Sequence, residues 1–240
     1  MNDRVKKYLE NEKIIVSLII SLAFVLSSMI FAGAIFNVKS AQRFVSVKGF
    51  SERQVKADLA LWPIRFTAAS NELGQIYSQI DSTQKSVLAF LKEQGFKEEE
   101  IIPDQPKVTD RQAQLYIDNT NAPTRYIAEA GFLVKSSNVD LVSKSLKDIA
   151  VLVGRGVSLS NQSNVEYLYS KLDEIKPEMI EEATKQARVA AEKFARDSGS
   201  RIGGIKNAYQ GLFSIEPLHF YTQDLKVVRV VTDIDYLLVD

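Results

Sequence analysis

The chain of 240 residues contains no cysteine and a single histidine, His219. Without cysteine, disulfides, thiolate metal sites and thiol nucleophiles are all excluded. A single histidine leaves little room for the usual zinc sites or for catalytic triads that need an imidazole base. These absences remove many enzyme classes.

The chain also lacks an excess of either charge. It has 30 Lys and Arg residues and 30 Asp and Glu residues, so its formal net charge is zero. Nucleic-acid binding through phosphate contacts needs a basic excess or a basic stripe. We therefore expect no nucleic-acid partner.

One long apolar run interrupts this balanced composition, at residues 14–36. The run carries no charged side chain. As a helix it would span roughly 34 Å at 1.5 Å per residue, enough to cross a hydrocarbon core of about 30 Å. Four basic residues precede it: Arg4, Lys6, Lys7 and Lys13. The positive-inside rule then keeps the N-terminus in the cytoplasm and sends the rest of the chain across the membrane.

Three interpretations of this run are open. An uncleaved signal anchor would make a single-pass protein of the inner (cytoplasmic) membrane, with its C-terminal domain in the periplasm or outside the cell. A cleavable signal peptide is the second, because Ala32-Gly33-Ala34 has the small-x-small form of a cleavage site. A buried helix of a soluble domain is the third. We expect the anchor, since the apolar run exceeds the usual signal-peptide core of about 7–15 residues.

The anchor would divide the chain into four parts. These are a cytoplasmic segment over 1–13, a transmembrane helix over 14–36, a linker over 37–43 and an extracytoplasmic domain over 44–240. The last part is long enough to bury a real core.

Hydrophobic periodicity and capping residues predict the elements of this domain. In chain order we expect strands over 44–50 and 55–68, a helix over 74–94, strands over 101–115 and 126–135, a helix over 138–153, a strand over 156–169, a helix over 173–198, and strands over 205–215 and 226–239. Pro63 suggests an edge strand or a bulge.

The order from 55 to 169 is that of a ferredoxin-like (split βαβ) core. We predict an α+β fold with an antiparallel sheet and packed helices, extended by a long Ala-rich helix and C-terminal strands.

Two patterns are interpreted as packing. Small and apolar residues follow one stripe of the third helix, and they indicate close approach within one subunit or between subunits: Met179, Ile180, Ala183, Ala187, Ala190, Ala191, Phe194 and Ala195. Aromatic residues on the predicted strands indicate a sheet core: Trp62, Phe66, Tyr126, Phe132, Tyr167 and Tyr169.

Candidate chemistry is sparse. Asp233 and Asp235 lie two residues apart on a predicted strand, where they could share a proton or a cation, but a solvated strand face is also a natural place for them. His219 lies among apolar neighbours in a predicted loop, which favours a core or interface histidine over a general base. We assign no catalytic, cofactor-binding or metal site and expect no cofactor.

Acidic and glycine-rich segments are interpreted without a chemical role. Glu98–Glu100 is expected to be a solvated turn. The segments 154–156 and 199–204 both follow helices, so they predict C-terminal caps; a phosphate-binding loop would precede a helix.

Several segments carry a family resemblance. They are 45–49 (VSVKG) with Asp58, 91–96 (LKEQGF) with 101–102, 126–134 (YIAEAGFLV), the helix over 182–195 with 199–203 (GSRIG), and 227–238. Together they resemble the SIMPL (DUF541) domain family over about residues 44–239. The chain departs from the family pattern at Asn71–Gly74, where an Ala-rich helix start is usual, and in lacking an obviously cleaved signal.

The resemblance implies an α+β envelope protein that can form large ring-like oligomers. Some members of the family are linked to oxidative-stress tolerance or known as surface antigens. It implies no established enzyme activity and no active-site residues.

We therefore expect a membrane-anchored envelope protein that acts without catalysis, through self-assembly and protein contacts. Its expected partners are the membrane through residues 14–36, further copies of the chain and other envelope proteins. A binding module for an envelope small molecule, lipid or glycan is the alternative, using a pocket between sheet and helices. A hydrolase that uses Asp233 and Asp235 ranks third.

Overall fold

The computed structural model describes Val16 and residues 20–29, 43–113, 123–161 and 163–239. It contains two compact units. Unit 1 holds the described residues of 1–50, 181–211 and 231–240, and unit 2 holds those of 51–180 and 212–230. Helices pack on two antiparallel sheets, which confirms the α+β class and corrects the single predicted sheet.

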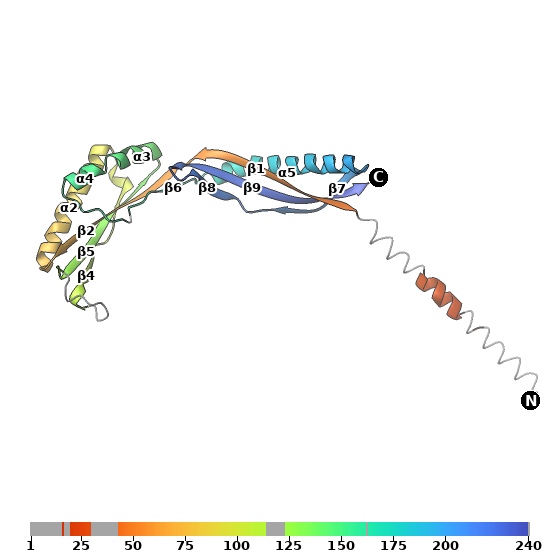
Figure 1. Ribbon diagram of the computed structural model, residues 1–240, viewed down its shortest axis with the longest axis horizontal. Coiled ribbons are helices and arrows are strands. Elements are labelled where there is room, and N and C mark those ends of the chain that lie inside the picture. The colour runs from red at the N-terminus through yellow and green to blue at the C-terminus, as the bar shows by residue number, and fades with distance from the viewer. Residues whose placement is uncertain (1–15, 17–19, 30–42, 114–122, 162, 240) are drawn as a thin grey trace, which may run out of the picture. The chain divides into compact units, whose positions relative to one another are not determined.

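The elements are β1 (Phe44–Lys56), β2 (Leu59–Ser70), α2 (Leu73–Gln94), η1 (Glu98–Glu100), β3 (Ile101–Pro103), β4 (Lys107–Asp110), η2 (Arg111–Ala113), β5 (Tyr126–Ser136), α3 (Val139–Lys147), α4 (Ala150–Gly154), β6 (Glu166–Leu168), α5 (Leu172–Asp197), β7 (Arg201–Gln210), β8 (Ser214–His219) and β9 (Thr222–Val239). Figure 1 labels most of the elements, and η1, β3 and η2 carry no label there.

The sheet of unit 2 has the strand order β3-β5-β2-β6, and β4 also pairs with β5. β2 and β5 pair antiparallel from Ala60 opposite Ser136 to Ser70 opposite Tyr126. α2 packs on β2 and β5, and α3 packs on β2. The elements from β2 to β6 therefore follow the predicted order of strand, helix, strand, strand, helix and strand.

Large side chains fill the interior of unit 2. Trp62, Ile64 and Phe66 alternate along β2 and are fully buried, as the period-two pattern predicts. Phe90 and Leu91 of α2 meet them in one hydrophobic cluster. Each such side chain removes a large apolar area from water, and this burial stabilises the fold by about 25 cal/mol per Å².

Pro63 does not make β2 an edge strand, which corrects the prediction. β2 has β5 on one side and β6 on the other, but the pairing with β6 ends at Leu61. Pro63 lies beyond that last pair. Among the described residues, no strand lies where it would accept a hydrogen bond from the N–H group that proline lacks.

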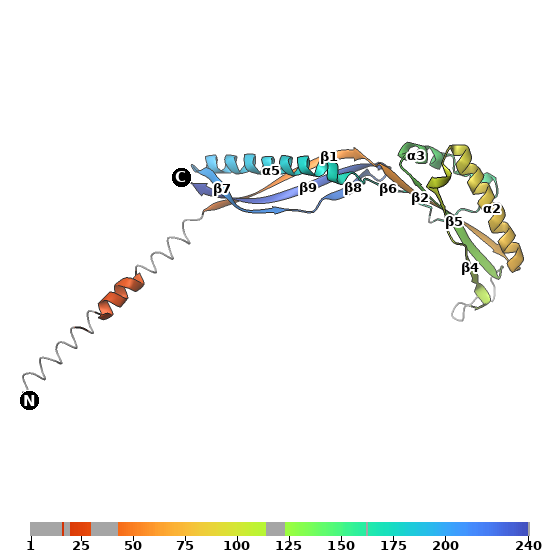
Figure 2. The same cartoon turned by 180° about the vertical axis from the view of Figure 1, so that it is seen from behind.

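Unit 1 is built from the first part of β1, the last part of β9, β7 and most of α5. Here β9 lies between β1 and β7, and α5 runs along the strands, as Figures 1 and 2 show from opposite sides. Val47, Ile234 and Tyr236 form its small core with two alanines of α5, Ala187 and Ala191.

The backbone of helix α5 lies directly against the backbone of β1. The buried positions of α5 recur every fourth residue: Met179, Ala183, Ala187, Ala191 and Ala195. A Cβ atom added to Gly49 of β1 would lie within 1.9 Å of the Ala183 carbonyl oxygen and 2.6 Å of the Ala187 nitrogen. Close packing inside the chain therefore uses this stripe, but Phe194, which the prediction placed in it, is 60% exposed.

Several predicted boundaries are wrong for local reasons. β1 continues to Lys56, and the strand expected over 101–115 is divided into β3 and β4. Between these two strands the pairing with β5 shifts by one residue, from Pro103 opposite Phe132 to Lys107 opposite Glu129, while Asp104 N donates to the Gly131 carbonyl. The helix expected over 138–153 is divided into α3 and α4.

The strand expected over 156–169 is reduced to β6. The rest of this segment is held to β2 by isolated hydrogen bonds in place of a continuous ladder. Ser160 N donates to the Arg65 carbonyl, and Arg65 N donates to Ser163 Oγ. The strand expected over 205–215 is instead two strands, β7 and β8, and it begins earlier, at Arg201.

The predicted transmembrane helix and linker lie largely outside the described residues. Val16 and residues 20–29 are described and helical. Within the described parts of the chain, no helix combines the length and the apolar character needed to cross a membrane.

Candidate functional site

The two aspartates of β9 are engaged by neighbouring strands. Asp235 accepts hydrogen bonds from Asn207 Nδ2 of β7 at 3.0 Å and from Ser46 Oγ of β1. These bonds hold the pKa of Asp235 below its ordinary value. Asp233 lies 3.6 Å from Lys48 Nζ. The two side chains share a face of β9 as expected, but a general acid needs a raised pKa, and Asp235 has a lowered one.

The remaining sequence candidates occupy structural positions. His219 is the last residue of β8, pairs with Thr222 and is exposed, so the expected loop and a core position are both wrong, whereas an interface position stays a prediction. Gly156 and Gly199 adopt the left-handed conformation with φ of 83° and 70°, which confirms that both glycine segments are helix caps. Glu100 is more than a solvated turn residue, since its carboxylate accepts hydrogen bonds from Ser136 Oγ and Lys97 N.

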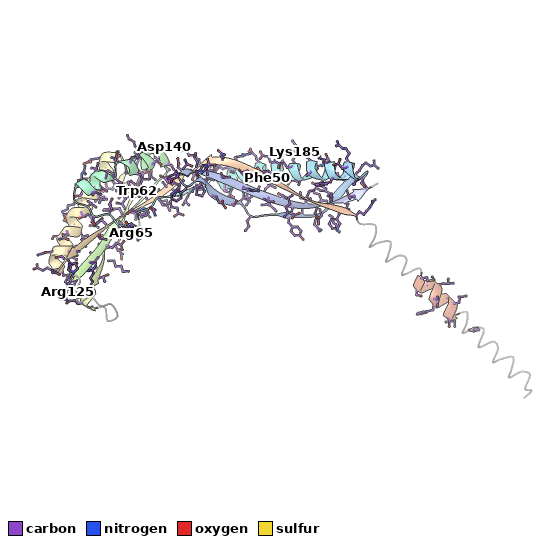
Figure 3. The ribbon with its side chains drawn as sticks, in the orientation of Figure 1. Phe50, Trp62, Arg65, Arg125, Asp140 and Lys185 are labelled. Atoms are coloured by element: carbon purple, nitrogen blue, oxygen red, sulfur yellow. The ribbon has the colours of Figure 1, made fainter. Side chains whose placement is uncertain are left out.

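Charged side chains of unit 2 form ion pairs at the surface. Arg125 Nη2 lies 2.8 Å from Asp110 Oδ2, and its guanidinium stacks on Tyr126. Arg65 pairs with Asp104, and Lys56 pairs with Asp140. Figure 3 shows Arg65, Arg125 and Asp140. Among the described residues, no three His, Asp or Glu side chains gather closely enough to hold a metal ion.

One edge of the unit 1 sheet is open. Among the described strands, β7 has β9 as its single neighbour. Nearly every residue of β7 is exposed, including the large apolar residues Ile205 and Tyr209. We call Arg201–Gln210 the β7 edge. A long exposed edge strand presents unpaired backbone donors and acceptors that another strand can use.

A groove of about 640 Å³ runs beside the β7 edge in unit 1. Its walls come from α5, with Thr184, Lys185 and Arg188, and from β7, with Gly204 and Ile205. Figure 3 labels Lys185 on α5. The helix thus leaves part of the sheet face uncovered next to the open edge.

A second concave surface lies in unit 2, where the β8–β9 hairpin meets β6. Two adjoining grooves of about 830 Å³ and 400 Å³ share Asn164, Tyr167 and Gln223. The smaller one is lined by Lys226, which is only 8% exposed. The sequence analysis missed this lysine, although the alternation of β9 signals it: position 226 is in phase with the buried Val228 and Val230.

A comparison with known families gives one match. The model described as "SIMPL: Protein of unknown function (DUF541)" matches residues 45–218, which is more than half of the chain. No curated protein matches the sequence.

Proposed function

Because the chain belongs to the SIMPL family, whose function is unknown, we propose that it is a membrane-anchored, extracytoplasmic protein of the cell envelope. It acts without catalysis, by binding further copies of itself and other envelope proteins. The observation that carries this proposal is the open β7 edge beside an uncovered strip of sheet.

The described N-terminal helix supports the anchor. Its large apolar side chains are exposed to solvent, among them Ile20, Phe24 and Met29. Exposed apolar residues in such density mark a surface that is covered by lipid or by another protein. A hydrocarbon layer would cover them on all sides, which suits the uncharged sequence of 14–36.

The β7 edge supports self-assembly. β7 is ten residues long. Its pairing with β9 is irregular between Ile202 and Asn207 and regular from Asn207 to Gln210, so this last part is where a strand of a second copy would pair. Natural proteins protect such edges with proline or charge. β8 has Pro217 in its strand, whereas β7 has no proline and exposes Ile205 and Tyr209. An anchor would add to the effect, because it concentrates copies on one membrane face.

The absence of cysteine from the natural sequence allows a direct test. Ala208→Cys and Gln210→Cys each place one thiol on the exposed β7 edge. Tyr77→Cys places one on the exposed surface of α2 as a matched control. Under mild oxidation of membranes that contain the full-length protein, the β7 variants should form disulfide-linked dimers at low expression, and the control should not.

Equal cross-linking of all three variants would reflect random collision and would contradict the proposed surface. Absence of cross-linking at both β7 positions would do the same. A non-catalytic role is tested separately: Asp233→Asn with Asp235→Asn should leave every phenotype of the protein unchanged.

A further inference from the structure

The grooves beside the β8–β9 hairpin form a continuous concave surface within unit 2. We call it the hairpin groove and define it by Asn164, Tyr167, Phe220, Tyr221, Gln223 and Lys226. Its two parts, about 830 Å³ and 400 Å³, fall in the range of small-molecule sites, about 300–1,000 Å³. Its chemistry is distinct from that of the β7 edge.

The walls of the hairpin groove are fixed by hydrogen bonds. Tyr167 Oη and Ser143 Oγ are 3.0 Å apart, which joins β6 to α3. Ala57 N donates to the Asp224 carbonyl at 2.7 Å, which holds the hairpin near its turn. A site with its walls held in place before binding loses less freedom when a ligand enters.

Lys226 is the unusual residue of this surface. It is 8% exposed, yet its ammonium makes no hydrogen bond or ion pair with any residue that the structure describes. Burial lowers the pKa of Lys226, and the negative charges of Glu166 and Asp224 oppose that effect. Among the described residues, Lys226 Nζ is not one of the fully buried polar atoms that lack a partner, so it reaches solvent at the groove wall. Its three donors are therefore available to a ligand that accepts hydrogen bonds.

The other polar groups of the hairpin groove define what that ligand must offer. Within the described chain, the side-chain amides of Asn164 and Gln223 are free of hydrogen bonds. Asp224 and Glu166 add carboxylate acceptors beside the donors of Lys226 and Lys147. Two acidic and two basic side chains balance, so the groove favours neither an anion nor a cation. A lipid tail is disfavoured because it would leave all these groups unpaired.

Two aromatic rings stand at the opening of the hairpin groove. Phe220 and Tyr221 form the turn between β8 and β9, are 78% and 93% exposed, and contact each other edge to face at 5.3 Å between ring centroids. The negative face of an aromatic ring attracts weakly positive C–H groups. The C–H face of a sugar ring presents such groups, while its hydroxyls both donate and accept hydrogen bonds.

We propose that the hairpin groove binds a neutral glycan, with a sugar ring packed on Tyr221 and hydroxyl groups bound by Lys226, Gln223 and Asn164. Hydroxyls of one sugar accept from the ammonium and donate to Asp224 or Glu166, which matches the mixture of donors and acceptors along the groove. This inference is independent of the self-assembly proposal, because it uses no residue of the β7 edge.

The test measures binding of neutral oligosaccharides to the full-length protein in a detergent without a sugar headgroup. Chitotetraose and maltotetraose are the probes, and titration calorimetry is the readout. At least one should bind saturably in the millimolar range or tighter. Lys226→Met should weaken it about tenfold or more, since a hydrogen bond to a charged group is lost. Tyr221→Ala should weaken it several-fold.

Tyr77→Ala is the matched control, because Tyr77 is an exposed tyrosine of α2 that lines neither part of the hairpin groove. It should leave binding unchanged. The proposal is overturned if neither oligosaccharide binds up to 10 mM, a ceiling of about −2.7 kcal/mol in binding free energy. It is equally overturned if Lys226→Met and Tyr221→Ala bind as the wild type does, or if inorganic phosphate competes with the oligosaccharide for the groove.

Discussion

The interiors of the two units are built in opposite ways. In unit 1, α5 meets β1 through Gly49, Ala183 and Ala187, and backbone atoms carry the contact. In unit 2, large side chains such as Trp62 and Phe66 fill the space between helices and sheet. A contact between backbones leaves no room for an added atom, whereas a core of large side chains leaves a cavity when one is shortened.

This difference predicts which substitutions each unit tolerates. Unit 1 should resist truncation and fail on enlargement, because its small residues already contribute few atoms. Unit 2 should show the reverse, because a single ring accounts for much of its buried area.

The largest effect is expected in unit 2. Phe66→Ala removes a fully buried ring from β2 and should lower the free energy of unfolding by about 3–5 kcal/mol. The matched change in unit 1, Ala187→Gly on α5, should cost only about 1 kcal/mol, mostly through lost helix propensity. Urea denaturation followed by Trp62 fluorescence and circular dichroism measures both. Equal losses would contradict the contrast.

Enlargement should have the second largest effect, and in unit 1. Gly49→Ala drives a Cβ into the Ala183 carbonyl, so α5 must shift away from β1. We expect a loss of about 3 kcal/mol, the upper end of overpacking costs. Gly204→Ala is the control, since a Cβ there meets nothing within 4 Å. Thermal unfolding of the two variants should differ clearly, and similar melting temperatures would refute the close approach.

A smaller effect of opposite sign is expected at the hairpin groove. Lys226→Met replaces a lysine at a largely buried position, whose ammonium has no partner in the described chain, with an apolar side chain and should stabilise the protein by about 1 kcal/mol. The pKa of Lys226 is lowered in the folded state, so the unfolded state binds more protons and wild-type stability rises with pH. The advantage of the variant should therefore shrink as pH approaches 10.5. A constant advantage would contradict the assigned cause.

The smallest effect concerns the aspartates of β9. The pKa of Asp235 is lowered by Asn207 and Ser46. Its contribution to stability is thus complete above the ordinary pKa of 3.8 and is lost as pH falls through the lower folded value. Asp235→Asn should reduce the acid dependence of unfolding in that window, measured by denaturation from pH 5 to pH 2. An unchanged pH profile would show that these hydrogen bonds are absent in solution.

Much of the fold was predictable in segments where local hydrophobic periodicity or a capping residue determines the structure. The Ala-rich repeat and Gly199 fix α5 nearly to its observed bounds, and Asn138 caps α3 by accepting from Leu141 N, as its residue type predicts. Strands with strict alternation, such as β5, were also found. These segments depend on local periodicity and capping, which a single sequence displays.

The rest depends on contacts between distant segments. Nothing local shows that Ser163 replaces a strand partner of Arg65, or that Gly211 lies against Val231 and ends β7. Lys226 shows how far the sequence predicts the groove residues. Its phase on β9 predicts burial, but the lack of a partner for its ammonium follows only from the positions of β6 and the hairpin.

The central claim, self-assembly of an anchored protein, is tested most directly by the mass of the full-length protein extracted in detergent. Light scattering combined with intact-mass spectrometry gives the number of copies and shows whether residues 14–36 are retained. We predict a closed oligomer of one defined size whose subunits keep the N-terminal segment. A monomer at every protein concentration, or a chain that begins after residue 36, would contradict it.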